Sequence, residues 1–175
     1  MRDIREPLKV FCDKREQAPW AWSPADVTLS FHSLVAGDYA LEADTEFVRG
    51  KEMLAVRFAI ERKSFDDFIG TISTGWDRFQ RELDRMASFP ARCIVVEGTF
   101  EQCCFVQRDQ PDRFGGMIDA PKHNHPMITP SFVARRVAEL TMMNVSVLFA
   151  GDAQLAAGLA YRIFLRRAEL ENMKV

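Results

Sequence analysis

Three consecutive charged residues, Glu61, Arg62 and Lys63, stand where an apolar run ends, in the segment AIERKSFDDF at 59–68. From residue 54 to 63 apolar side chains occupy every second position, and side chains alternate across a β-strand. Glu61 and Lys63 therefore share one face of the predicted strand, and Arg62 falls with the apolar set on the other. A carboxylate suits Mg²⁺, which prefers oxygen ligands. A neighbouring ammonium can position a water or offset charge that develops on a phosphate.

Such a site needs a second carboxylate, and Asp38 is the natural donor because it opens a predicted strand at 36–43. If the strands at 38–43 and 54–63 are neighbours, Asp38 and Glu61 can reach one ion. Gly37 would permit a close backbone approach or an unusual turn. Taken alone, Asp followed by Glu-x-Lys is a common pattern. An isolated match is explained more simply by a solvated strand end whose ion pair contributes little.

The remaining segments predict the elements that must position these residues. Strands are expected at 8–13, 27–34, 36–43, 92–98 and 145–150, with a hairpin over 45–63 that turns near Gly50. Helices are expected at 64–74, 76–87, 131–143 and from Asp152 to about 171, and the segment at 101–130 is expected to be irregular. Strands that alternate with helices predict an α/β architecture. The 175 residues suffice for a single domain, 1–175, with its own core.

Composition limits the kinds of partner. A net charge of −2 and a pI of about 5.9 argue against a protein coated in positive charge, although a local basic stripe remains compatible. No apolar stretch approaches the length of a membrane span, and residues 1–10 carry charges where a signal peptide needs an apolar core. The expectation is a cytoplasmic protein, in a bacterial or phage-infected cell, with reduced cysteines and no contact with a membrane.

Four short segments add specificity because they occur in a fixed order. They are DKRE at 13–16, GDY at 37–39, ERK at 61–63 with Asp67, and Arg78-Phe79. Together they resemble the nuclease domain of the XPF-type structure-specific endonucleases (the xeroderma pigmentosum group F and Mus family), in the PD-(D/E)XK superfamily. The resemblance covers residues 8–100 by motif and 130–170 by layout. It implies a restriction-endonuclease-like fold, a central mixed β-sheet flanked by helices.

The resemblance also implies roles for individual residues. Asp38 and Glu61 would bind Mg²⁺ or Mn²⁺, and Asp13 would be a direct or water-mediated ligand. Lys63 would orient or activate the attacking water.

Other roles stay open between chemistry and structure. Arg62 and Arg15 would lie near the scissile phosphate or brace the acids, and an ion pair of purely structural value explains Arg62 equally well. Glu16 and Asp67 would support the ligands from behind, although a helix cap alone explains Asp67. Glu97, at the end of a predicted strand, is either an acid of the site or a solvated terminus.

Two helices carry surfaces that suit a partner. In the helix at 76–87 one face holds Arg78, Arg81 and Arg85, which could follow a DNA backbone or could simply be solvated. The last helix has more apolar positions than one sheet face needs, and the family dimerises in this region, so a homodimer is a hypothesis. Residues 151–175 are too short for the tandem helix-hairpin-helix modules of larger members, so the chain looks like the stand-alone versions of phages and prophages.

The predicted function is therefore metal-dependent endonuclease action on branched, flapped or single-stranded DNA, in repair or recombination. The alternative is a catalytically silent subunit that only binds DNA or a partner. Degenerate copies tend to lose the acids or the lysine, and here Asp13, Asp38, Glu61 and Lys63 are all present. RNA as the substrate also remains open.

Overall fold

The computed structural model describes residues 6–49, 51–85, 91–106 and 128–172. Within them a mixed six-stranded sheet forms the centre, with the order β2-β1-β3-β6-β7-β8. The strands are β1 Leu8–Asp13, β2 Val27–His32, β3 Tyr39–Leu41, β6 Phe58–Ser64, β7 Ala91–Glu97 and β8 Val145–Phe149. Only β3 runs antiparallel to its neighbours, and the other adjacent strands pair in parallel. The predicted α/β class with a mixed central sheet is confirmed.

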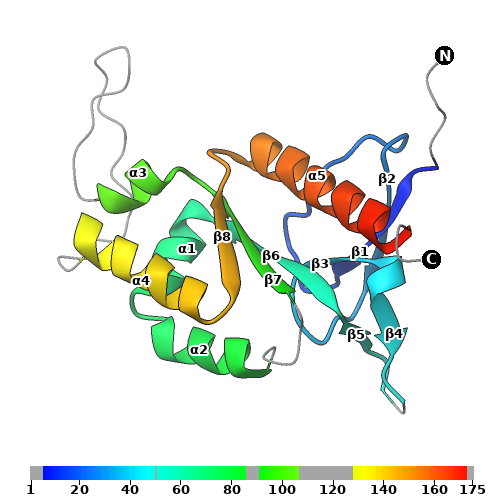
Figure 1. Ribbon diagram of the computed structural model, residues 1–175, viewed down its shortest axis with the longest axis horizontal. Coiled ribbons are helices and arrows are strands. Elements are labelled where there is room, and N and C mark those ends of the chain that lie inside the picture. Colours follow the sequence, from blue (N-terminus) through cyan, green and yellow to red (C-terminus); the bar gives the residue numbers. More distant parts are fainter. Residues whose placement is uncertain (1–5, 50, 86–90, 107–127, 173–175) are drawn as a thin grey trace.

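Helices cover both faces of this sheet (Figure 1). On one side lies α5, Ala153–Asn172, and on the other lie α1, Phe65–Ile72, α2, Trp76–Arg85, and α4, Pro130–Met142. Side-chain caps fix several starts: Ser64 accepts a hydrogen bond from the Asp67 N–H, and Asp152 accepts one from the Leu155 N–H. Both caps were predicted from the sequence.

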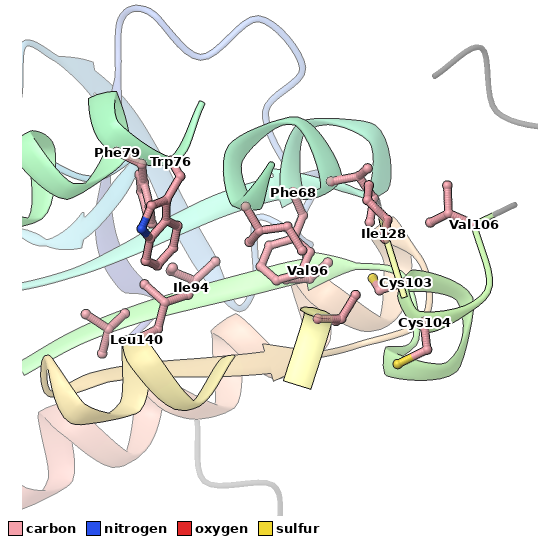
Figure 2. Packing of buried hydrophobic residues seen from close by; sticks show 14 of the residues in the cluster. Phe68, Trp76, Phe79, Ile94, Val96, Cys103, Cys104, Val106, Ile128 and Leu140 are labelled. Atoms are coloured by element: carbon pink, nitrogen blue, oxygen red, sulfur yellow. The ribbon is translucent and has the colours of Figure 1, made fainter. Parts of the chain in front are cut away.

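Strand β7 shows how the sheet divides the core in two. Ile94 and Val96 point toward α1, α2 and α4, where they pack with Phe68 and other buried side chains (Figure 2). Val95 points the other way and packs in the cluster that contains Phe164 of α5. Because side chains alternate along a strand, β7 contributes apolar side chains to two different clusters, one on each face of the sheet.

The predicted hairpin strand at 54–63 is in fact two strands. Strand β5, Leu54–Val56, pairs with β4, Thr45–Phe47, in a separate two-stranded sheet, and β6 begins only at Phe58. Between them the Arg57 N–H donates to the Asp44 carbonyl, 2.8 Å away, in the short helix η1, Glu42–Asp44. Asp44 is itself buried and held by Arg167 of α5 at 2.8 Å. The predicted turn residue Gly50 lies outside the described residues.

The segment at 101–130 is not wholly irregular. Helix α3, Phe100–Cys104, starts with a capping box in which Thr99 and Gln102 satisfy each other's backbone N–H groups. Residues 107–127 lie outside the described part. The four cysteines are free and buried, and burial raises the pKa of Cys93 to about 11, so its thiol stays protonated at neutral pH. Among the described helices none has the length and apolar character needed to cross a membrane.

The layered core gives a first testable expectation. Phe68 is 1% exposed, at the centre of the cluster in Figure 2, whereas Phe47 of β4 is 78% exposed. Phe68→Ala should lower the free energy of unfolding by about 3–5 kcal/mol because it opens a cavity. The matched change Phe47→Ala should alter it by no more than about 0.5 kcal/mol. Urea unfolding monitored by circular dichroism measures both, and equal effects would contradict the described layering.

Candidate active site

The predicted acids meet at one edge of the sheet because of how three strands run. Strands β1 and β6 point the same way, and antiparallel β3 lies between them, so their carboxyl ends meet the start of β3. Asp13 ends β1, Asp38 immediately precedes β3, and Glu61 and Lys63 lie near the end of β6. Strands β3 and β6 are therefore neighbours, as the prediction of a shared site required.

Gly37 makes this close approach possible. Its φ of +78° lies in the left-handed region that favours glycine. A Cβ atom at Gly37 would lie only 2.4 Å from the Cβ of Ala59 on β6. Both the conformation and the contact demand glycine, so the sequence Gly-Asp places the Asp38 backbone directly against β6.

Asp38 and Glu61 form the acidic pair of the site. Asp38 Oδ2 accepts a hydrogen bond from the Arg62 backbone N–H at 2.8 Å, and Glu61 Oε1 accepts one from Lys63 Nζ at 2.7 Å. Among the described residues no hydrogen bond reaches Asp38 Oδ1 or Glu61 Oε2. Burial, followed by repulsion from Glu61, raises the pKa of Asp38 to about 7.

That electrostatic conflict is what a divalent cation would relieve, since it would favour the ionised form of both acids. The donors are carboxylate oxygens, which suit Mg²⁺ and Mn²⁺, and Mg²⁺ is commonly bound through one or two carboxylates with waters completing its shell. In the described part of the chain no group of three or more His, Cys, Asp or Glu is arranged to hold a metal ion. The residues present thus fit an ion bound by two carboxylates and water.

Asp13 is occupied by other partners. Its Oδ1 accepts hydrogen bonds from the backbone N–H and Nε of Arg15, at 2.8 and 2.6 Å, and its Oδ2 accepts one from the Leu34 N–H at 2.8 Å. Burial acts to raise the pKa of Asp13, but the hydrogen bonds from Arg15 and Leu34 hold it below its usual value. An ionised, saturated Asp13 favours a brace for Arg15 over a direct metal ligand.

Lys63 remains a cation in this setting. Burial alone would lower the pKa of its ammonium, but the charge and hydrogen bond of Glu61 raise it above the ordinary value. Nζ lies 5.7 Å from the centre of the Phe79 ring on α2. A protonated lysine can orient a water or offset negative charge, and it has no free electron pair with which to accept a proton.

Arg62 points to the opposite side of β6, as strand alternation predicts. Its Nε and Nη2 donate to the two carboxylate oxygens of Glu97 at 2.7 and 2.9 Å, and its Nη1 donates to Glu16 at 2.9 Å. The Trp20 indole N–H also donates to Glu97, at 2.6 Å.

Sequence reasoning left Glu97 open and missed Trp20. The signal for Glu97 was its place on β7, two residues after the α5-facing Val95. Strand alternation, together with the pairing of β6 and β7, would have put it on the same side as Arg62. No comparable pattern points to Trp20, which reaches Glu97 from a loop.

The other predicted residues have simpler surroundings. Asp67 is exposed and its contacts are with Ser64, so the described structure accounts for it as part of the helix cap. On α2, Arg78 and Arg81 are exposed, and Trp76, Phe79 and Leu83 are buried on the opposite face. The side chain of Arg85 lies outside the described residues.

Comparisons with known proteins identify a family and a shared fold. A family model described as the ERCC4 domain matches residues 12–163. Two solved structures of XPF from Aeropyrum pernix, one in complex with DNA, have the same fold, with TM-scores of 0.56 and 0.57 and sequence identities of 22% and 21%. They cover 91% and 94% of this chain, and the chain spans 61% and 66% of theirs, less than two thirds of their length. No curated protein sequence matches the chain.

The contact between Gly37 and Ala59 can be tested through stability. Gly37→Ala should lower the free energy of unfolding by roughly 2–4 kcal/mol, from left-handed backbone strain together with overpacking. Gly158→Ala, on α5 where an added Cβ meets no atom within 4 Å, should raise it by about 0.5–1 kcal/mol. Denaturant titration of both variants measures the difference, and a neutral Gly37→Ala would refute the close approach.

Proposed function

Because the chain belongs to the ERCC4 domain family, we propose that it is a metal-dependent endonuclease that hydrolyses phosphodiester bonds in DNA. The observation that carries the proposal is the acidic pair Asp38 and Glu61, each with an oxygen to spare, beside a protonated Lys63. Two hard anionic ligands next to a fixed cation suit a reaction in which negative charge grows on phosphate oxygens.

In this proposal Asp38 and Glu61 hold Mg²⁺ or Mn²⁺. Such an ion supplies two things when bound: it lowers the pKa of a water ligand and offsets charge on the phosphate. Lys63 donates a hydrogen bond to Glu61 and keeps the carboxylate oriented, while its remaining N–H groups can orient the attacking water. The apolar ring of Phe79 shields one side of the ammonium from solvent.

Arg15 is the residue we assign to the phosphate. Its side chain is 72% exposed, although Asp13 holds Nε and Nη2 in a fixed orientation. Among the described residues no hydrogen bond involves its Nη1, so that group is available to an incoming anion. The pKa of Arg15 is raised above its ordinary value, chiefly by the hydrogen bond to Asp13 and to a smaller extent by the neighbouring Asp38 and Glu61.

The substrate we favour is branched, flapped or single-stranded DNA, which the enzyme would cut in repair or recombination. One of the two solved structures is described as a complex with DNA, which supports this choice. The exposed arginines Arg78 and Arg81, with Arg85 next in the predicted row, would contact the DNA backbone from α2, beside Lys63.

We also propose a homodimer through the C-terminal helices, which is supported by the exposed Leu155 and Leu170 on α5.

Removal of either acid tests the proposed chemistry. Asp38→Asn and Glu61→Gln should each reduce cutting of labelled flap, fork and single-stranded DNA by roughly 10²-fold or more, because each removes a negative charge that attracts the cation. EDTA should abolish wild-type cutting, and Mn²⁺ should restore it. Asp152→Asn, a matched carboxylate-to-amide change at the cap of α5, should cut like the wild type.

A wild-type protein that binds DNA but cuts none of these substrates with either metal would instead support the silent binding module. Equal rates for Asp38→Asn, Glu61→Gln and wild type would show that the chemistry lies elsewhere.

Salt dependence tests the arginines of α2. If Arg81 contacts one phosphate, Arg81→Ala should weaken DNA binding and reduce the slope of log K against log salt by about one unit. Arg166→Ala, an exposed arginine on α5, should leave the slope unchanged. Fluorescence anisotropy in EDTA, which prevents cutting, measures both. Identical slopes for the two variants and the wild type would remove α2 from the interface.

A further inference from the structure

A buried network behind the acidic pair joins four residues from three parts of the chain. Arg62 of β6 is its centre: every nitrogen of its guanidinium donates to a carboxylate, two to Glu97 of β7 and one to Glu16. Trp20 adds its indole N–H to Glu97 at 2.6 Å. The Arg62, Glu97 and Glu16 side chains are only 15%, 9% and 10% exposed, so this is an interior cluster and not a surface ion pair.

Two of its members belong to one loop, residues 14–26, which follows β1. Glu16 and Trp20 attach the first half of the loop to Arg62 and Glu97. The Trp20 ring also stacks on Tyr39, with ring centres 4.7 Å apart, and the backbone N–H of Trp20 donates to the Tyr39 hydroxyl at 2.8 Å. The second half is attached separately, since the Trp22 indole donates to the Ala157 carbonyl of α5 at 2.8 Å.

Arg15 immediately precedes Glu16 in this loop, so the position of one constrains the other. The Glu16 side chain reaches to the α5 side of β6, where Arg62 lies. The Arg15 side chain lies with Asp13, within the electrostatic influence of Asp38 and Glu61. The adjacent residues Arg15 and Glu16 thus connect the acidic pair, Asp38 and Glu61, with the buried network.

We propose that Arg62 is a positioning residue: with Glu97, Glu16 and Trp20 it forms a latch that holds the 14–26 loop, and therefore Arg15, beside the Asp38–Glu61 pair. The inference rests on the proposed function in one respect, that Arg15 contacts the phosphate. Each guanidinium nitrogen of Arg62 already donates to a carboxylate, and the side chain faces away from Glu61. The latch is held firmly because removal of one partner would leave a buried charge unpaired.

Activity measurements can separate a latch from general stabilisation. Trp20→Phe keeps an aromatic ring against Tyr39 and removes the N–H that donates to Glu97. In the wild-type background it should reduce the single-turnover cutting rate about tenfold, the scale of effect for groups that orient a metal site from outside. In an Arg15→Ala background it should cause no further loss, because the residue that the latch positions is already gone.

The matched control is Trp22→Phe, which removes an indole hydrogen bond from the same loop but not from the latch. It should change the cutting rate less than twofold in both backgrounds. If Arg15→Ala cuts too slowly to measure, Arg15→Lys serves as the second background. Equal losses from Trp20→Phe with and without Arg15 would overturn the proposal, as would an unchanged rate in the wild-type background.

A second measurement does not depend on nuclease activity. Glu97→Gln replaces the charged partner of Arg62 with an isosteric amide. Amide hydrogen exchange, followed by mass spectrometry, should then be about tenfold faster in peptides that cover residues 15–20 and unchanged in α4. Glu139→Gln, which alters a partly buried ion pair with Arg136 on α4, should not change exchange in the loop.

The two measurements distinguish failure of the latch from failure of the proposed function. If the wild-type protein cuts no DNA but Glu97→Gln loosens residues 15–20, the nuclease assignment fails and the latch stands. If exchange in the loop is the same in Glu97→Gln and wild type, the latch is wrong whatever the protein cuts.

Discussion

The structure depends on how tightly the Asp38 backbone is held between two strands. Its N–H donates to the Ile60 carbonyl of β6 at 3.0 Å, and its carbonyl accepts from the Asp13 N–H of β1 at 2.8 Å. Strands β1 and β6, which run in the same direction, are thereby linked through the residue that precedes antiparallel β3, and their acidic ends are brought together. The arrangement is possible only because Gly37 lets the chain pass against Ala59. A rigid backbone at this point fixes the geometry of a site better than a loop would.

Strand β6 separates two kinds of electrostatics on its two sides. Toward α2 it presents Glu61 and the Lys63 ammonium, next to Asp38, and toward α5 it presents the Arg62 guanidinium, each nitrogen of which donates to a carboxylate. The acids of the whole region are Asp13, Glu16, Asp38, Glu61 and Glu97, and the bases are Arg15, Arg62 and Lys63. With every group ionised the acids outnumber the bases by two charges. One of these two charges lies among Asp38, Glu61 and their neighbours, on the side where we place a divalent cation, and the other lies where Glu16 and Glu97 share Arg62.

Local patterns in the sequence predicted most of the elements and the facing of the key residues. Alternation along β6 was enough to place Arg62 opposite Glu61 and Lys63, because side-chain direction in a strand is a short-range property. Contacts between distant segments could not be read in the same way. Arg62 meets Glu97 across 35 residues, and Arg167 meets the Asp44 side chain across 123. The Asp44 carbonyl accepts a hydrogen bond from the Arg57 N–H, at the point where the predicted strand is interrupted. Which charged residues become partners depends on how distant segments pack in the fold. The sequence near each residue shows only that it carries a charge.

The anchoring of Trp22 to α5 has a consequence for the order in which the 14–26 loop is fixed during synthesis. Its indole hydrogen bond to Ala157 joins residues 135 positions apart, and buried α5 side chains such as Phe164 complete the core on that face of the sheet. All the acids we assign to the site leave the ribosome long before α5 does. The second half of the 14–26 loop therefore gains its anchor only when the final helix folds onto the sheet, whereas all four residues of the latch have been made once β7 is complete.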